Sequence, residues 1–200
     1  MILYAIPFTC SLAARLALAG LPHEVRWMRR FEHILDDGTA YAAINPKRRV
    51  PALALEDGEL LTEIPVVLDH IDGLVADRPA KERRRLREWL GYLATELHRA
   101  ALFPLFDPAT PDATRDDVLT RLLPPTLAHL DAALADRPTL LGAEPPSPAD
   151  HYLLWALTLL RLRFRERVPH GLEAYRARLA ATPWISAALA EERAELTARS

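Results

Sequence analysis

The sequence predicts an α/β domain followed by an all-helical domain, and three observations support this division. Short apolar runs alternate with helical segments over residues 1–76. From residue 80 onward only helical periodicity continues. A proline directly precedes an apolar run at Val50-Pro51, where it fits the first residue of a strand because proline cannot donate to a sheet ladder. We therefore place the two domains at 1–76 and 80–200.

The composition is that of a soluble globular protein. Of the 200 residues, 50% are hydrophobic and 26% are charged, which allows a sizeable core. The formal net charge of −2 creates no field that would attract nucleic acid or an anionic membrane. The single cysteine, Cys10, excludes an intramolecular disulfide and favours a reducing compartment. Because no signal peptide or membrane-length apolar run is present, we expect a cytoplasmic protein with no membrane segment.

The first strand and the first helix flank this cysteine. Met1–Ala5 is a short apolar run, and a helix is expected over Ser11–Ala19, closed by Gly20. Glu24–Met28 is expected to form the second strand. The segment from Arg29 to Ala43 has no clear pattern, so we expect only a short helix or a loop there.

The remainder of this domain follows the proline. Ala52–Leu55 is expected as a strand after Val50-Pro51, and Leu60-Leu61 as a second short strand beyond a turn. A helix opens at Thr62-Glu63 and continues over Pro65–Leu74, since proline is tolerated in the first helical turn. The order strand, cysteine, helix, strand, X-Pro, strand, strand and helix is that of a thioredoxin-like domain.

Two apolar stripes predict long helices in the second domain. An irregular segment, Pro104–Pro111, separates them, and Pro124-Pro125 should kink or restart the second helix. The first stripe consists of Leu86, Trp89, Leu90, Leu93 and Leu97, and the second of Val118, Leu119, Leu122, Leu123, Leu127, Leu130 and Leu134.

A capping box begins the next helix. In Ser147-Pro148-Ala149-Asp150 the serine and the aspartate are three residues apart, and Pro148 stands at the first helical position. The helix from Pro148 to about Arg163 is apolar around most of its circumference and is therefore expected to be buried. Two shorter helices, Leu172–Ala180 and Trp184–Ala198, are expected to follow.

Ordered matches to one protein family span nearly the whole chain. They are Tyr4, Pro7, Cys10-Ser11-Leu12, Ala43-Ile44-Asn45-Pro46-Lys47, Val50-Pro51-Ala52-Leu53, Leu61-Thr62-Glu63, Glu88-Trp89-Leu90, Ala94-Thr95-Glu96-Leu97-His98 and Ser147-Pro148-Ala149-Asp150. Together they resemble the glutathione S-transferase family, and specifically its bacterial beta class. The resemblance implies a thioredoxin-like N-terminal domain on an all-α C-terminal domain, glutathione as co-substrate, and a homodimer.

Cys10 is the first candidate catalytic residue. It stands at a helix N-terminus, where the positive end of the helix dipole stabilises a thiolate, so we expect a pKa below that of a free cysteine. The alternative is a small buried hydrophobe, since cysteine is among the most buried residue types, and position alone does not separate the two. In the beta class the matching cysteine lies against the glutathione sulfur and can form a mixed disulfide with it.

The candidate glutathione-binding residues are Val50, Pro51, Glu63 and Ile64. The resemblance implies that the Val50 backbone pairs with the cysteinyl amide of glutathione, which a cis Val50-Pro51 bond would favour; an ordinary trans bond is the commoner alternative. Backbone N–H groups around Glu63-Ile64 would receive the γ-glutamyl carboxylate, and the Glu63 carboxylate would meet its ammonium group. Read without the family, Glu63 is a solvated first-turn acid favoured by the helix dipole.

Several positions depart from the family pattern. Relatives usually carry serine or glycine where this chain has Ile64, and the loss of one hydrogen bond to a carboxylate costs roughly 1.5–3 kcal/mol, enough to weaken glutathione binding tenfold or more. Phe8 stands where many relatives carry glycine, and Gly91 where they carry an asparagine. Arg48-Arg49 replaces a usual Gly-Gln.

His98 is the second candidate catalytic residue. In the beta class the matching histidine points toward the glutathione sulfur, where it could donate a hydrogen bond or move a proton. The alternative is a surface histidine favoured near a helix C-terminus. No metal-ligand spacing occurs among the histidines and acidic residues, so no metal site is expected. The basic run of residues 81–87 lacks interleaved aromatics and is expected to be a solvated face that binds no nucleic acid.

The resemblance implies a cytoplasmic detoxification enzyme. Glutathione would attack a small hydrophobic electrophile, or exchange thiols through Cys10, with the electrophile lying near Leu93, Leu97 and Phe103. Two alternatives stay open: a glutathione-dependent isomerase or biosynthetic enzyme for one metabolite, and a non-catalytic binding or scaffold protein of the same fold.

Overall fold

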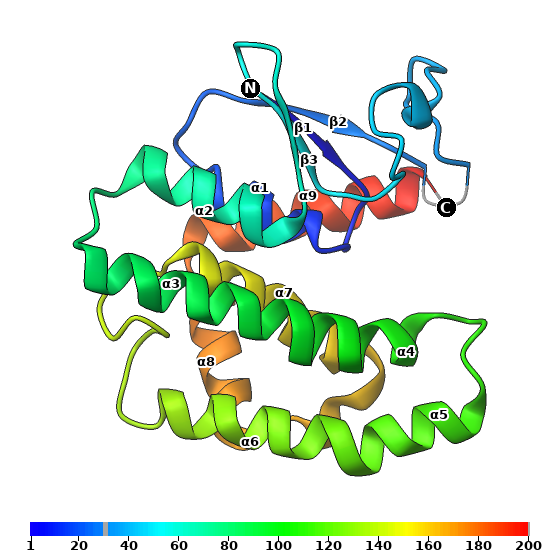
Figure 1. The fold of residues 1–200 in the computed structure, drawn as a ribbon. Coiled ribbons are helices and arrows are strands. Elements are labelled where there is room, and N and C mark those ends of the chain that lie inside the picture. Colours follow the sequence, from blue (N-terminus) through cyan, green and yellow to red (C-terminus); the bar gives the residue numbers. More distant parts are fainter. Residues whose placement is uncertain (30–31, 200) are drawn as a thin grey trace.

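The computed structural model describes residues 1–29 and 32–199. In this part of the chain four strands form one mixed sheet: β1 (Ile2–Ala5), β2 (Glu24–Trp27), β3 (Ala52–Ala54) and β4 (Leu60–Thr62). Their order is β2-β1-β3-β4, with β1 parallel to β2 and antiparallel to β3 (Figure 1). The parallel pair is joined by a helical crossover and the β3–β4 pair is a hairpin, which confirms the predicted thioredoxin-like N-terminal region.

Helices cover the sheet on the side that faces the rest of the chain. α1 (Ser11–Ala17) and α2 (Ile64–Val75) pack between the sheet and the later helices (Figure 1). The apolar side chains of this layer are fully buried, among them Leu3, Leu12 and Leu53. The core therefore continues from the sheet through α1 and α2 into the helical region.

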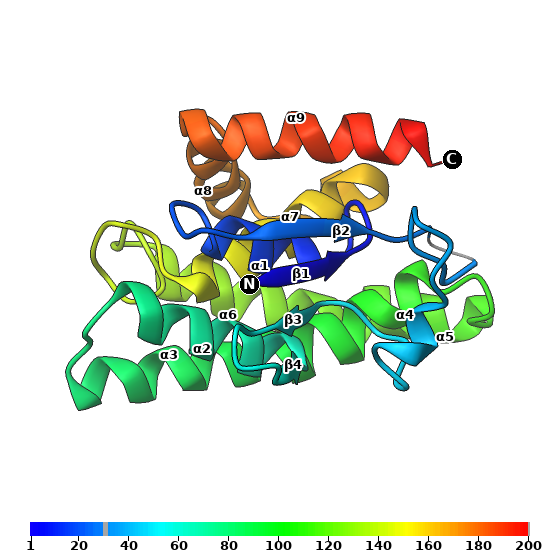
Figure 2. The ribbon, with the colours of Figure 1, turned by 90° about the horizontal axis from the view of Figure 1, so that it is seen from above.

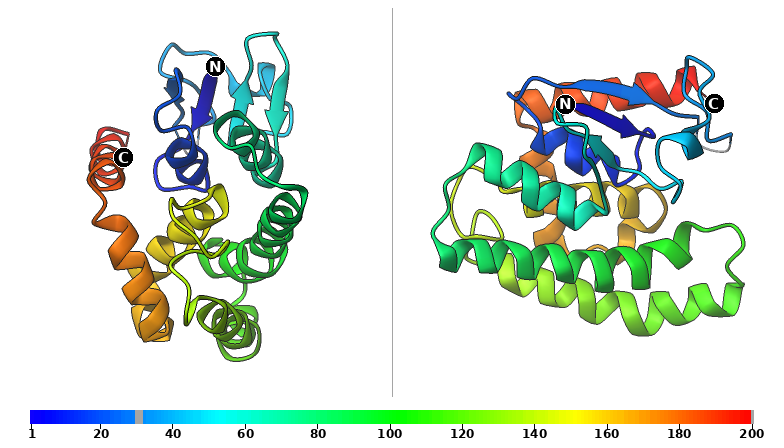
Figure 3. Two further views of the ribbon diagram at one scale, coloured as in Figure 1. Left: turned by 90° about the vertical axis from the view of Figure 1, so that its left-hand side faces the viewer. Right: turned by 45° about the horizontal axis from the view of Figure 1, so that its top comes forward.

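The C-terminal region is helical, as predicted. Its elements are α3 (Ala80–Tyr92), η2 (Leu93–Leu102), α4 (Phe103–Phe106), α5 (Asp112–Asp117), η3 (Val118–Leu122), α6 (Leu123–Leu134), α7 (Pro148–Phe164), η4 (Arg165–Arg167), α8 (His170–Ala180) and α9 (Pro183–Ala198). Figure 3 shows α7 surrounded by the other helices, and most of its residues are buried. The final helix, α9, returns to the N-terminal region and contacts α1 (Figure 2).

Prolines explain two of the helix boundaries. Pro124 and Pro125 stand in the first turn of α6, which restarts after the π-helical stretch η3, as predicted. The prediction of an irregular segment from Pro104 is wrong at its start, because α4 continues helically to Phe106 with Pro104 in its first turn. The π-helical geometry of η2 was not predicted, since apolar spacing does not distinguish it from an α-helix.

The predicted capping box is present at the start of α7. The backbone N–H of Ser147 donates to Asp150 Oδ2 at 2.8 Å, and the Ser147 side chain in turn accepts the backbone N–H of Asp150. Asp150 is fully buried and also accepts the Leu140 N–H at 2.8 Å and the Tyr175 hydroxyl at 2.6 Å. One carboxylate therefore joins the start of α7, the preceding loop and α8.

The poorly patterned segment contains a short 3-10 helix, η1 (Tyr41–Ala43), and residues 30–31 of it lie outside the described residues. The proposed domain boundary between residues 76 and 80 coincides with the extended connection from α2 to α3 and stays a prediction. None of the helices in the described residues combines the length and apolar character needed to cross a bilayer.

Candidate functional site

The loop between β1 and α1 places Cys10 at the start of α1. The Ile6 carbonyl accepts the Thr9 hydroxyl at 2.8 Å and the Ser11 hydroxyl at 3.0 Å, which closes the turn before the helix. Cys10 is the N-cap residue of α1, so its position at a helix N-terminus is as predicted. This turn directs the Cys10 side chain toward the chain that enters β3.

Cys10, which follows β1, contacts Val50, which precedes β3. The Cys10 thiol donates to the Val50 carbonyl oxygen at 3.2 Å, and the Val50-Pro51 bond, left open by the sequence, is cis. Cys10 is only 8% exposed. The residue therefore lies at the backbone edge that the sequence predicted for glutathione.

The expected lowering of the Cys10 pKa is wrong for the ligand-free protein. Burial raises the pKa of the Cys10 thiol to about 12, although the helix N-terminus and the charge of Arg49 both act to lower it. Glu63 raises it further. Loss of hydration of the thiolate thus outweighs the helix dipole, and Cys10 is a protonated thiol near neutral pH.

The turn before Val50 is held by two side chains. The Tyr41 hydroxyl and the Asn45 amide both donate to the Arg49 carbonyl, at 2.9 Å and 2.8 Å. Because these bonds fix the peptide immediately before Val50, they also fix the carbonyl and N–H that Val50 presents.

Glu63 and Ile64 mark the start of α2. Glu63 is the N-cap residue with φ of 67°, a left-handed conformation rare for a non-glycine residue. Its carboxylate is exposed and accepts from Lys47 Nζ at 3.0 Å, while the same amine donates to the Thr62 hydroxyl at 2.8 Å. The Ile64 side chain is buried, so it packs into the core and leaves the helix N-terminus to its backbone.

His98 lies on η2 and is bound to α7. Its Nδ1 shares a hydrogen bond with the Tyr152 hydroxyl at 2.7 Å, and its ring meets Trp155 edge-on with a centroid distance of 4.7 Å. Burial, and secondarily the charge of Arg99, lowers the pKa of His98 to about 4. His98 is therefore neutral near pH 7, where it can accept a proton but carries no charge.

Tyr152 connects His98 to the region of Cys10. It is almost fully buried, and its pKa is raised first by burial and then by the neighbouring Cys10. Tyr152 thus lies within electrostatic range of Cys10, which contacts Val50, and bonds His98 through its hydroxyl. No prediction from the sequence included Tyr152, because helical periodicity marks it only as a buried residue of α7.

The expected lining for the electrophile is partly wrong. Leu93 and Leu97 are fully buried in the core, because the first apolar stripe packs inward against α7. Phe103 is half-buried, and the guanidinium groups of Arg99 and Arg49 lie over its ring at 4.3 Å and 5.9 Å. The surface beside the candidate site therefore combines one aromatic ring with positive charge.

Two basic residues of the site were also missed. Lys47 forms an ion pair with Glu63, and the charge of Arg49 lowers the pKa of Cys10. Both belong to the basic segment Lys47-Arg48-Arg49, and its position directly before Val50-Pro51 could have indicated them. Among residues 1–29 and 32–199, no three histidine, cysteine or acidic residues gather closely enough to hold a metal ion.

Comparisons with known proteins agree with this geometry. Residues 7–74 match the model of the glutathione S-transferase N-terminal domain. The chain is 35% identical to glutathione S-transferase GstA of Escherichia coli O157:H7 over 204 residues, covering 96% of this chain and 98% of that protein.

Solved structures extend the likeness to the whole fold. A sphingomonad glutathione S-transferase complexed with glutathione superposes with a TM-score of 0.84 at 32% identity, covering 96% of this chain and 98% of the other. The beta-class glutathione S-transferase of Sphingomonas chungbukensis gives a TM-score of 0.85 at 32% identity with the same coverage. This chain belongs to the glutathione S-transferase family, and its structural neighbours include a bacterial beta-class member.

Proposed function

We propose that the chain is a glutathione transferase that binds glutathione along Val50 and the start of α2, with the glutathione sulfur beside Cys10. The observation that carries the proposal is the hydrogen bond from the Cys10 thiol to the Val50 carbonyl at 3.2 Å. It places a thiol at a backbone edge able to pair with an extended peptide. The family relative solved with glutathione bound supports the choice of tripeptide.

The charges around this edge suit a peptide with two carboxylates and one ammonium group. Glu63 supplies an exposed carboxylate for the ammonium, and the N-terminus of α2 supplies backbone N–H groups for a carboxylate. Positive charge beside this edge comes from Arg49 and from Lys47, which pairs with Glu63 in the ligand-free protein. Glutathione binding would exchange the Lys47–Glu63 pair for contacts of each residue with the ligand.

We infer two reactions for this site. In conjugation, the glutathione thiolate forms a sulfur–carbon bond to a small hydrophobic electrophile, and the electron pair of the broken bond leaves with the departing group. In thiol exchange, a mixed disulfide between glutathione and a substrate is attacked by the Cys10 thiolate, and the displaced partner leaves as a thiolate. In this proposal the role of His98 is to hold the Tyr152 hydroxyl through their 2.7 Å hydrogen bond while glutathione reacts.

Two other members of the same fold class remain as second candidates. A glutathione-dependent isomerase or biosynthetic enzyme would use the same Val50 edge for one dedicated metabolite. A binding or scaffold protein is favoured by Ile64-Pro65, since Pro65 offers no N–H in the first turn of α2. We further propose a cytoplasmic homodimer acting in detoxification; the half-exposed Val66, Leu74 and Val75 on α2 provide apolar surface that a second subunit would cover.

Replacement of Cys10 by alanine should separate the two reactions. We expect exchange with a glutathione mixed disulfide to fall to the uncatalysed rate, because in this reaction the Cys10 sulfur must attack the disulfide. Conjugation to an aromatic halide should persist, since the glutathione sulfur itself is the nucleophile. Steady-state assays with both substrates measure this, with Cys10→Ser as the isosteric control. Wild-type protein that binds glutathione but is inactive in both assays would favour the dedicated enzyme, and absence of binding would favour the scaffold.

A further inference from the structure

Phe8, two residues before Cys10, has a backbone conformation that its side chain disfavours. Its φ is 56°, in the left-handed region that bulky residues rarely occupy. Such a residue persists only where its surroundings hold it, and such strain is concentrated at functional sites. The contacts that hold Phe8 are therefore informative about the loop that presents Cys10.

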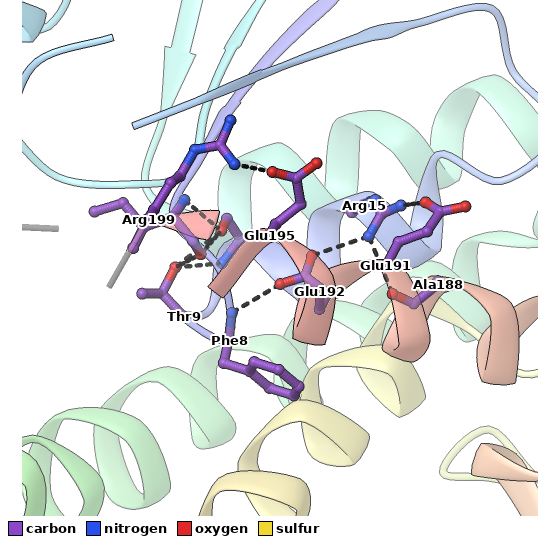
Figure 4. A network of polar contacts seen from close by, with 10 residues as sticks. Phe8, Thr9, Arg15, Ala188, Glu191, Glu192, Glu195 and Arg199 are labelled. Atoms are coloured by element: carbon purple, nitrogen blue, oxygen red, sulfur yellow. Dashed lines mark hydrogen bonds and ion pairs between the residues drawn. The ribbon is translucent and has the colours of Figure 1, made fainter. Parts of the chain in front are cut away.

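Both sides of the Phe8 residue are held by long-range hydrogen bonds. Its N–H donates to Glu192 Oε2 at 2.7 Å, and its carbonyl accepts from the Trp155 indole N–H at 3.1 Å. Figure 4 shows the Glu192 carboxylate directed at the Phe8 N–H, while the phenyl ring points away from it. A residue of the last helix, α9, thus bonds the backbone of the first loop.

Glu192 is fully buried, which is unusual for a carboxylate. Burial raises its pKa, while the Phe8 N–H and the charge of Arg15 act in the opposite direction. Arg15 Nη1 lies 3.2 Å from Glu192 Oε1, so each carboxylate oxygen has a different partner (Figure 4). One carboxylate oxygen pairs with the Arg15 guanidinium of α1, and the other accepts the Phe8 N–H.

The neighbouring Glu191 provides a natural comparison. It also pairs with Arg15, but its side chain is 65% exposed and its only described partner is that arginine. Arg15 is further held by the Ala188 carbonyl at 3.1 Å, so its position does not depend on one carboxylate. The contact that distinguishes Glu192 from Glu191 is the bond to Phe8.

We propose that Glu192 is a positioning residue for Cys10, because its carboxylate holds Phe8 in the left-handed conformation that sets the Cys10 thiol against the Val50 carbonyl. Only the consequence of this role, the alignment of Cys10 with glutathione, rests on the proposed function. Without the bond to Glu192, Phe8 relaxes to negative φ, the loop up to Cys10 rotates, and the thiol loses its contact with Val50. Cys10 then becomes more accessible while the glutathione site becomes less well formed.

The first test compares three single variants by the rate at which iodoacetamide alkylates Cys10 in the folded protein, followed by intact mass. Glu192→Leu, which removes the acceptor, should raise the rate about tenfold. Glu192→Gln keeps an acceptor for the Phe8 N–H and should stay near the wild-type rate. Glu191→Leu, which removes an ion pair with the same arginine, should also stay near it.

The second test distinguishes positioning from general destabilisation. In the Glu192→Leu background, Phe8→Gly should restore slow alkylation, because glycine adopts a positive φ without steric cost. Phe8→Ala removes the same ring but keeps the Cβ atom that opposes this conformation, and should not restore it. Alanine at a positive φ also lowers global stability, so urea unfolding of both double variants is measured in parallel, and a difference in alkylation rate larger than their stability difference explains reports the backbone at position 8.

Equal alkylation rates for glycine and alanine at position 8, or an unchanged rate in Glu192→Leu, would overturn the proposal. If Glu192→Leu fails to fold, the smaller truncations Glu192→Ala and Glu191→Ala are compared instead, and faster alkylation is expected only for Glu192→Ala. Alkylation requires no glutathione, so a protein that fails to bind glutathione still tests the role of Glu192. Glutathione binding with no effect of these variants would instead refute only the positioning role.

Discussion

Replacing Asp150 with alanine is expected to lower the free energy of unfolding by about 3–5 kcal/mol. The carboxylate is fully buried and accepts the backbone N–H groups of Ser147 and Leu140 and the hydroxyl of Tyr175. The variant leaves these donors unpaired away from water, which costs far more than the loss of an exposed helix cap. The effect should appear in urea unfolding followed by circular dichroism.

Tyr175→Phe is the matched control for this prediction. It removes only one donor to Asp150, at 2.6 Å, and leaves the capping box intact, so a loss of only about 1–2 kcal/mol is expected. The larger stability loss expected for Asp150→Ala than for Tyr175→Phe tests whether Asp150 stabilises the fold through several hydrogen bonds. A smaller loss for Asp150→Ala than for Tyr175→Phe would contradict the network that joins α7, α8 and the preceding loop.

In the ligand-free protein Cys10 is expected to be alkylated far more slowly than a free cysteine at neutral pH. Burial raises its pKa from 9.0 to about 12. Each pKa unit changes the thiolate fraction tenfold, so this rise leaves about a thousandfold less thiolate at neutral pH. Because the acid form is the protonated thiol, the rate should increase steadily with pH and level off only near the raised pKa.

A pH series of alkylation rates, with Cys10→Ser as the blank, measures this titration. The folded state should be checked at each pH by circular dichroism, so that alkaline unfolding is not mistaken for ionisation. A rate that levels off near or below the pKa of a free cysteine would mean that the helix dipole dominates over burial. The thiol would then be activated before glutathione arrives.

The sequence was sufficient to predict the fold, and it selected two residues of the candidate site that lie in contact. Proline before an apolar run located the start of β3, and Ser147 with Asp150 located the start of α7, because turn and cap residues act locally. Cys10 and Val50 were both identified, and the structure places them in contact at 3.2 Å. The resemblance to the transferase family, more than the local sequence pattern, was the reason for selecting these two residues.

Other features depend on packing between distant residues and were missed for that reason. The burial that raises the Cys10 pKa, the bond between His98 and Tyr152, and the bond between Phe8 and Glu192 all join separate elements. Glu192 is 184 positions from Phe8, and nothing in its local sequence marks it as buried. The inward position of Leu97 was misassigned because one apolar stripe can face a core or a ligand.

Glutathione binding along the Val50 edge and the start of α2 is tested most directly by following backbone amide resonances by NMR during a glutathione titration. We expect saturable shifts at millimolar glutathione for Val50, Ile64 and Cys10, with the amide of Leu130 in α6 unchanged as an internal reference. Glu63→Gln should weaken the binding while leaving the spectrum of the free protein nearly unaltered, because the Glu63 side chain is exposed. Shifts that saturate elsewhere, or no shifts at these three amides, would contradict this binding site.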